Sequence, residues 1–486
     1  MDSKLAGPLQ ETIRLLKRRG VDYADARWVE ETHEELVVQN LQLQHVSLST
    51  TEGISIRVLY HGAWGYASSV RTDPAGLKHT AETAIEMAKA VARDAHARVK
   101  LRPVPPVRGR YETPLEVDPF QVEMQKKLDY LMWAGQVLKD HDSIKTATAM
   151  LEFFRTDKIF CSTEGALIEQ RVTESGGTIE ATASLGHEVQ KRSYPSSNGS
   201  CLTQAGYEYV KALDFAGEAV RVRKEAVALL RAKECPSGPA TVLLMPDQLI
   251  LQIHESCGHP AELDRALGLE LSFAGGSFLT PDLLGKFRYG SKRVNITADA
   301  TLPFGCGTFA YDDEGMPARR VPIIREGLFV DYLSSRESAA AIGRSSSAAM
   351  RADGWNSVPI VRMTNVSLEP GGGTLEEMIR DTKRGLLMAT NKSWSIDDRR
   401  LNFQFGAEIA WEIRNGKLGQ VYKNPVYTGI TPEFWGSCSA IAGKEDWKLY
   451  GVPNCAKGEP VQIMHVGHGA SPARFEKVNV GRHAAR

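Results

Sequence analysis

The sequence predicts an α+β protein of two main domains, an N-terminal region of sheets and long helices and a C-terminal region rich in antiparallel strands. Alternating apolar and polar residues, which are typical of half-buried strands, occur on both sides of long helical patterns in the first half. The second half carries many short strand patterns separated by turn pairs. Proline-rich segments at 99–117 and 235–239 mark a sub-boundary and a domain boundary, so we expect domains at 1–234 and 239–486.

The N-terminal elements follow from these patterns in order. Residues 34–45 and 54–59 are expected to form paired antiparallel strands, and 73–98 a helix. The segment 99–117, with four prolines, is expected to be an extended connector. Asp118 followed by Pro119 predicts a capped helix that runs to about residue 142. The remaining N-terminal predictions are strands at 146–154, 158–161 and 167–183, a polar loop at 193–199 and a helical segment at 205–232.

The C-terminal region is predicted to begin with the apolar strand 240–245. Pro246 and Asp247 then open an apolar segment that indicates a mostly buried helix ending near His254. Beyond it, turns are expected at Glu314-Gly315, Glu326-Gly327 and Asn415-Gly416, and the last is a strong hairpin pattern.

The motif His254-Glu255-Ser256-Cys257-Gly258-His259 places two imidazoles and a carboxylate within six residues. This combination can hold a metal ion and activate water, which points to metal-assisted hydrolysis. The histidines are five residues apart, which on a regular α-helix leaves them about 140° out of line. We expect either Gly258 and Pro260, with His259 pushed out of the α region, or a local π-type turn to bring them together.

Two histidines do not complete a catalytic zinc site, which usually has three protein ligands. The spacing alone leaves Glu262, Asp264 and the distant Cys455 open as the third ligand. Cys257, inside the motif, is a rival whose role helical geometry leaves undecided.

Several segments together resemble the TldD/PmbA metallopeptidase family, in its TldD-like branch that carries the HExxxH motif. The resemblance runs over nearly the whole chain and is carried by His254–His259, Phe309–Gly315, Arg325–Tyr332, Arg362–Asn365, Gly451–Cys455, Ala24–Arg27 and Gly53–Ala67. It implies a zinc peptidase in which His254, His259 and Cys455 bind the metal and Glu255 is the general base. Ala456 departs from the glycine that commonly follows this cysteine in the family.

The resemblance also implies an unfolded or extended peptide as substrate and a dimer that encloses a chamber. The dimer would be a homodimer or a heterodimer with a motif-lacking PmbA/TldE-like paralogue. Two other functions stay open: a non-catalytic peptide-binding or regulatory protein with a structural metal, and a small-molecule amidase.

Other residues could in principle take part in catalysis or metal binding, but a structural role is the simpler interpretation of each. Tyr311, Tyr332 and Arg336 are candidates for stabilising an oxyanion only because they lie in or next to family-like segments. Asp312-Asp313-Glu314 indicates an acidic turn, since its spacing lacks the EF-hand pattern. His465 and His468, next to glycines, are expected to be exposed loop residues, with metal binding as a minority interpretation.

Charge and composition exclude several classes of partner. Lys+Arg and Asp+Glu both number 59, and no long basic run occurs, so nucleic acid is not expected as a direct partner. No run of about 18 apolar residues indicates a membrane span, and the first residues lack the pattern of a signal peptide. Seven irregularly spaced cysteines fit a reducing compartment, so we expect a cytoplasmic protein.

Overall fold

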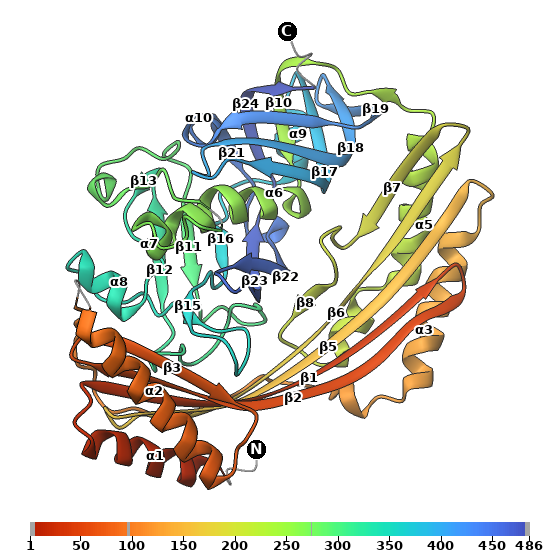
Figure 1. The fold of residues 1–486 in the computed structure, drawn as a ribbon. Coiled ribbons are helices and arrows are strands. Elements are labelled where there is room, and N and C mark those ends of the chain that lie inside the picture. Colours follow the sequence, from red (N-terminus) through yellow and green to blue (C-terminus); the bar gives the residue numbers. More distant parts are fainter. Residues whose placement is uncertain (1–4, 95–97, 274, 482–486) are drawn as a thin grey trace.

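The computed structural model describes residues 5–94, 98–273 and 275–481 (Figure 1). The predicted α+β class is confirmed, with sheets that are mainly antiparallel. Figure 1 shows a long curved sheet from the first half of the chain, with the smaller sheets of the second half lying over its inner side. The placement of domain boundaries at 1–234 and 239–486 stays a prediction.

The N-terminal sheet is built from four long antiparallel strands and shorter strands at its edges. In spatial order the main path is β3 (Ala63–Ser69), β2 (Gln42–Tyr60), β1 (Tyr23–Gln39), β5 (Ile144–Ser162), β6 (Leu167–Leu185) and β4 (Arg108–Glu112). Two further strands, β7 (Glu188–Tyr194) and β8 (Cys201–Thr203), also pair with β6.

Three N-terminal predictions differ from the structure. The expected strand 34–45 is a hairpin, because Asn40 and Leu41 adopt positive φ angles and turn the chain between β1 and β2. The strands expected at 146–154 and 158–161 are one continuous strand, β5. The connector 99–117 contains β4, which pairs in parallel with β6.

Helices cover the two ends of this sheet (Figure 1). At one end, α1 (Ala6–Arg18) and α2 (Pro74–Asp94) bury their apolar faces against β1 and β2. At the other end, α3 (Met124–Lys139), α4 (Tyr207–Ala212) and α5 (Phe215–Leu229) enclose a second core. The predicted helix 73–98 matches α2, except that residues 95–97 lie outside the described residues.

Two predicted helices are divided in the structure. Asp118 accepts a hydrogen bond from the backbone N–H of Phe120 and caps a single 3₁₀ turn, and the α-helix itself begins only at Met124. The helical segment 205–232 breaks between α4 and α5 at Asp214, whose φ is 45°.

The C-terminal region contains one large mixed sheet and smaller ones. The large sheet follows the order β17 (Arg384–Ile396), β10 (Gly238–Leu244), β24 (Ala473–Val480), β20 (Val426–Ile430), β18 (Asn402–Arg414), β19 (Lys417–Lys423) and β9 (Lys233–Glu234), with β21 (Cys438–Ile441) beside β24. The smaller sheets are formed by β13 (Leu328–Phe329), β12 (Arg320–Arg325), β11 (Ile296–Asp299) and β16 (Val366–Leu368), by β14 (Met350–Arg351) and β15 (Ile360–Val361), and by β22 (Lys448–Lys457) and β23 (Gln462–Ala470). The hairpin expected at Asn415-Gly416 joins β18 to β19, with positive φ at both residues.

The helix that leads into the motif lies in the C-terminal core. The helices of this region are α6 (Pro246–Ile253), α7 (Leu263–Ala266), α8 (Arg336–Ala341), α9 (Leu375–Arg380) and α10 (Thr431–Gly436). As predicted, α6 begins at Pro246 and is almost wholly buried, between β17 and the β22–β23 hairpin. Of the helices in the described part of the chain, none has the length and apolarity to cross a bilayer.

Candidate metal centre

A single π turn follows α6 and carries the motif. Residues His254–Gly258 form this turn, and the backbone N–H of His259 donates to the carbonyl of His254, an i→i+5 hydrogen bond. In such a turn, residues five apart lie on the same side of the helix, whereas in a regular α-helix this holds for residues four apart. The two imidazole rings therefore lie 4.7 Å apart between centroids and nearly perpendicular. The π-type turn is confirmed, whereas the expectation that Pro260 pushes His259 out of the α region is wrong, since His259 has φ −58° and ψ −44°.

His254 is oriented by a relay of hydrogen bonds through His468. The Nδ1 of His468 lies 2.8 Å from the carbonyl oxygen of Val366, and because a carbonyl can only accept, this nitrogen carries the proton. The Nε2 of His468 then accepts from the Nδ1–H of His254, at 2.8 Å. Burial lowers the pKa of His254 to about 4 and that of His468 to about 3, so both rings are neutral near pH 7. The lone pair of His254 Nε2 stays free for a metal.

His259 is oriented by a carboxylate. Its Nδ1 donates to Glu262 Oε2 at 2.9 Å, which leaves the lone pair of Nε2 free as well. Glu262 is fully buried and its charge is balanced by Arg265 at 3.3 Å and by Lys457 at 3.5 Å. A carboxylate behind a histidine is the usual support of a metal-ligating imidazole, since it fixes the ring and raises its basicity.

The structure brings Cys455, from β22, to these two histidines. Donor atoms of His254, His259 and Cys455 all lie within 4.8 Å of one another, and the Sγ of Cys455 is 3.9 Å from Nε2 of His259. Burial alone would raise the pKa of this thiol, but the guanidinium of Arg362 and the ring of His259 outweigh it, and the pKa lies below its usual range. A readily formed thiolate is the state in which cysteine binds metals.

The other residues considered for the third position have different partners. Glu262 supports His259, and Asp264 forms an ion pair with Lys457 at 2.8 Å. Cys257 accepts a hydrogen bond from Tyr289 at 3.2 Å inside the core, and burial raises the pKa of its thiol to about 12.

The residues present fit a zinc ion. Two neutral imidazoles with free Nε2 lone pairs and one acidified thiol are the nitrogen and sulfur donors that zinc prefers. Three protein donors would leave a fourth position of a bound zinc open, as in catalytic rather than structural zinc sites.

Glu255 faces the same cavity, where it meets an arginine that the sequence did not single out. The cavity has a volume of about 360 Å³ and is lined by His254, His259, Cys455, Glu255 and Arg400. Arg400 lies in the loop between β17 and β18 and donates from Nη1 to Oε2 of Glu255. Among the described residues that line the cavity, it is the only lysine or arginine. No local pattern in Asp397-Asp398-Arg399-Arg400 indicates this role.

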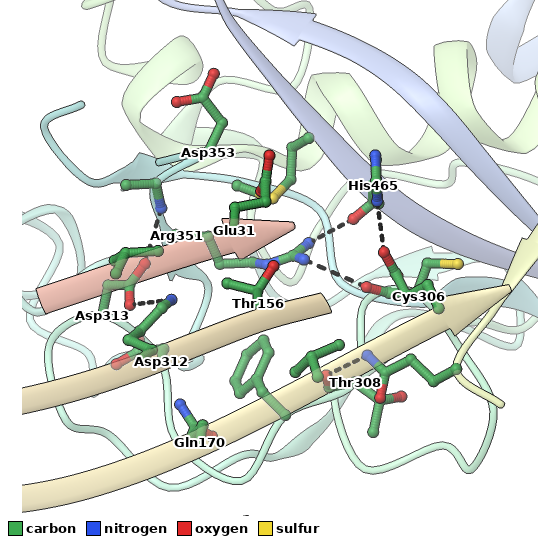
Figure 2. Close-up of a pocket in the computed structure, with 18 of the residues that line it drawn as sticks. Glu31, Thr156, Gln170, Cys306, Thr308, Asp312, Asp313, Arg351, Asp353 and His465 are labelled. Atoms are coloured by element: carbon green, nitrogen blue, oxygen red, sulfur yellow. Dashed lines mark hydrogen bonds and ion pairs between the residues drawn. The ribbon is translucent and has the colours of Figure 1, made fainter. Parts of the chain in front are cut away.

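The three oxyanion candidates lie outside this cavity. Tyr332 donates its hydroxyl to the carbonyl of Leu279 in the core, and Arg336 forms an ion pair with Glu164. Tyr311 lines a separate cavity of about 110 Å³ between the N-terminal sheet and the C-terminal region (Figure 2).

Two further predictions concern residues around that second cavity. Asp312–Glu314 form a turn, as expected, but a buried one, in which Asp313 pairs with Arg27 and Lys158. The expectation of exposed loop histidines is wrong, because His465 and His468 both lie on β23. His468 supports His254, and His465 is mostly buried beside Glu174, at 2.5 Å (Figure 2).

The chain is similar to known metallopeptidases in sequence and to a solved structure in fold. The family model described as PmbA/TldA metallopeptidase C-terminal domain matches residues 237–482, and the model of domain 1 of the same metallopeptidases matches residues 24–88. The metalloprotease MJ0996 of Methanocaldococcus jannaschii is 28% identical over 93% of this chain and 96% of its own length. A zinc metalloprotease TldD homologue of Saccharolobus solfataricus is 23% identical, over 96% of this chain and 98% of its own. The crystal structure of TldE from Thermococcus kodakarensis has the same fold, with a TM-score of 0.77 at 15% identity, over 98% of this chain and all of its own.

Proposed function

Because the chain belongs to the PmbA/TldD metallopeptidase family, we propose that it hydrolyses peptide bonds in unfolded or extended peptides at a zinc site formed by His254, His259 and Cys455. Glu255 is the general base of this proposal. The observation that carries it is the convergence of three metal donors and one carboxylate on a single cavity.

Each residue of the cavity has a separate role in the proposed reaction. Zinc held by the three donors supplies a Lewis acid for the scissile carbonyl and for a water molecule. Glu255 takes the proton of the attacking water and passes it to the leaving amine. Arg400, already in contact with Glu255, holds this carboxylate in place and offers its remaining N–H groups to the negative charge that develops on the carbonyl oxygen.

A set of three donor side chains favours a catalytic over a structural metal. A structural zinc site recruits a fourth side chain, and the described residues that surround the three donors include no fourth histidine or cysteine within the same 4.8 Å. The binding-protein alternative therefore receives less support than the peptidase.

Metal analysis combined with hydrolysis tests the proposal. We expect one zinc per chain in the wild type, its loss in Cys455→Ala and its retention in the control Cys257→Ala. Glu255→Gln should keep the zinc and lose hydrolysis of an unfolded, fluorescently quenched peptide. Zinc retained without Cys455, or full activity without Glu255, would refute the assigned roles. Binding of peptide without hydrolysis by the zinc-loaded wild type would favour the binding protein, and turnover of small amides alone would favour the amidase.

The proposal includes an assembly and a compartment. A homodimer, or a heterodimer with a motif-lacking TldE-like paralogue, would enclose the cavity and restrict it to unfolded chains, and the shared fold with TldE supports such a pairing. Native mass spectrometry of the purified chain, alone and with such a paralogue, distinguishes the two assemblies. A monomer that degrades folded proteins as fast as unfolded ones would contradict the enclosed chamber. The cytoplasm is the proposed compartment.

A further inference from the structure

A large groove adjoins the cavity that holds the metal donors. It has a volume of about 940 Å³ and lies between β1 and β2 on one side and the loops at 353–358 and 458–462 on the other. Phe273 lines both this groove and the catalytic cavity, so the two spaces are neighbours. The turn at 458–461 directly follows β22, the strand that carries Cys455.

The groove is lined by acidic side chains without basic ones. Its charged residues are Glu31, Asp264, Glu270, Asp353 and Glu459, and among its described lining residues none is lysine, arginine or histidine. Within the described part of the chain, Asp264 alone of these five forms an ion pair, with Lys457. The whole chain has equal numbers of acidic and basic residues, so this imbalance is local.

Glu270 is the most informative of these acids because it is only 6% exposed. It accepts one hydrogen bond, from the backbone N–H of Gly458 at 3.2 Å, and no ion pair to it is found within the described part of the chain. Burial raises the pKa of its carboxyl group, and the charge of Lys457 counteracts this only in part. A buried carboxylate that lacks a direct ion pair is costly, and a cation entering the groove would offset that cost.

Glu31 and Asp353 form a second acidic position, at the border between the groove and the cavity of Figure 2. Figure 2 labels both residues among the lining of that cavity, and the charge of Asp353 is one of the smaller causes that raise the pKa of Glu31. Burial is the largest cause that raises this pKa, and His465 counteracts it only in part. No hydrogen bond or ion pair of the Glu31 side chain is found among the described residues.

The apolar part of the lining also suits cationic side chains. Tyr66, Phe273 and Trp355 line the groove together with the acids. Aromatic faces attract lysine and arginine head groups and also pack against their methylene stems.

From this combination we propose that the groove binds lysine and arginine side chains of the substrate, so that the enzyme prefers unfolded peptides that carry basic residues near the scissile bond. This preference rests on the proposed peptidase function. Acidic peptides would meet like charges in a partly enclosed space, which strengthens discrimination against them.

Binding and hydrolysis of matched peptides test the preference separately. Three labelled unfolded peptides differ only in three positions, all Lys, all Gln or all Glu. Binding is measured by fluorescence anisotropy with zinc-loaded Glu255→Gln, and kcat/KM with the wild type. We expect the Lys peptide to bind at least about tenfold more tightly than the Glu peptide at about 20 mM salt, with a smaller ratio at about 0.5 M salt.

Charge-neutralising variants locate the preference. In the Glu255→Gln background, Glu31→Gln with Glu270→Gln should reduce the Lys-to-Glu binding ratio by about threefold or more, because the groove loses two negative charges. The exposed pair Glu376→Gln with Glu445→Gln makes the same charge change elsewhere and should leave the ratio unchanged. If the buried Glu270→Gln change prevents folding, Glu31→Gln with the exposed Glu459→Gln replaces it. Equal affinity for all three peptides, or the same loss in both double variants, would overturn the proposal.

The two proposals can fail independently. If the wild type hydrolyses no peptide while the inactive variant still prefers the Lys peptide, the peptidase assignment fails and the acidic groove stands. If peptides are hydrolysed without regard to charge, the peptidase stands and the groove preference fails.

Discussion

Both motif histidines have Nε2 free for the candidate zinc site, although different side chains hold the two rings in place. His254 is held by a neutral imidazole and His259 by a carboxylate. A carboxylate partner increases the electron density on the ring, whereas a neutral partner mainly fixes the tautomer and the orientation. His468 is therefore a positioning residue whose loss should affect the metal more than the fold.

His468→Phe should weaken zinc binding by about 10- to 100-fold, because the Nδ1–H of His254 would be buried without an acceptor. His468→Gln should lose less affinity, since its amide oxygen can accept the same hydrogen bond. Competition with a chromophoric chelator measures both affinities. Identical losses in the two variants would indicate a packing role for His468 and not an orienting one.

The proposed role of Arg400 gives a second prediction at the residue scale, which concerns the rate of hydrolysis. Replacing it with alanine should lower kcat by about 10²- to 10³-fold, since one donor to the developing negative charge is removed. Zinc content should not change, because Arg400 contacts Glu255 and none of the three donors through a hydrogen bond. Arg399→Ala is the matched control, because this neighbouring side chain is exposed and does not line the cavity. A rate loss caused by lost zinc would contradict this role.

The sequence predicts the candidate metal ligands and the general base, but not the residues that support them. His254, Glu255 and His259 occur together in one motif, and Cys455 was found through flanking residues that resemble a family. His468, Arg362 and Arg400 reach the site from strands and loops more than 90 residues away from the motif. No local pattern connects such residues, because only the folded chain brings them together.

At the scale of elements, the π turn determines the geometry of the site. The sequence predicted that a distortion was needed and left open which one. In the structure Gly258 has φ −70°, an ordinary helical value, so glycine is not required there for backbone freedom. It is required for space, because a Cβ atom at this position would lie 2.0 Å from Sδ of Met363.

Gly258→Ala should therefore destabilise the protein by about 1–3 kcal/mol, the usual cost of overpacking a core. The midpoint of urea unfolding, measured on the metal-free protein, reports this change. Gly372→Ala is the control, because a Cβ there meets no atom within 4 Å, and it should leave the midpoint nearly unchanged. A neutral effect of Gly258→Ala would mean that Met363 moves aside without cost.

The long N-terminal strands show why element boundaries were harder to predict than element types. β5 carries Arg155, Thr156 and Asp157 in its middle, a polar interval that separates two apolar patterns. Those residues are paired with neighbouring strands and with Asp118 and Arg171, so the strand continues through them. Cross-strand partners, which the local sequence does not reveal, extend the element.

At the scale of the whole molecule, ion pairs connect the two halves of the chain. Asp313, from the C-terminal half, binds Arg27 and Lys158 of the N-terminal sheet. Glu174, on β6, binds His465 on β23 in the same interface. The second pair contains a histidine, so the stability of the interface should depend on pH near neutrality.

The pH dependence of this pair has a definite sign. Burial opposes the charge of His465, but Glu174, with help from Glu31 and Glu152, outweighs it and raises the pKa of His465 above its ordinary value of about 6.5. The pair therefore stabilises the fold fully below about pH 6.5 and loses this contribution as the pH rises through the raised pKa.

Glu174→Gln should accordingly reduce the free energy of unfolding by roughly 1–3 kcal/mol at about pH 5.5, and by clearly less at about pH 9. Urea unfolding of the wild type and the variant at both pH values measures this difference. Glu180→Gln removes a carboxylate that pairs with Lys191 on the same sheet, and its small effect should be the same at both pH values, since this pair contains no histidine. If Glu174→Gln costs equal stability at both pH values, the carboxylate acts by packing and hydrogen bonding, and the two halves of the molecule are not joined by a titrating contact at this point.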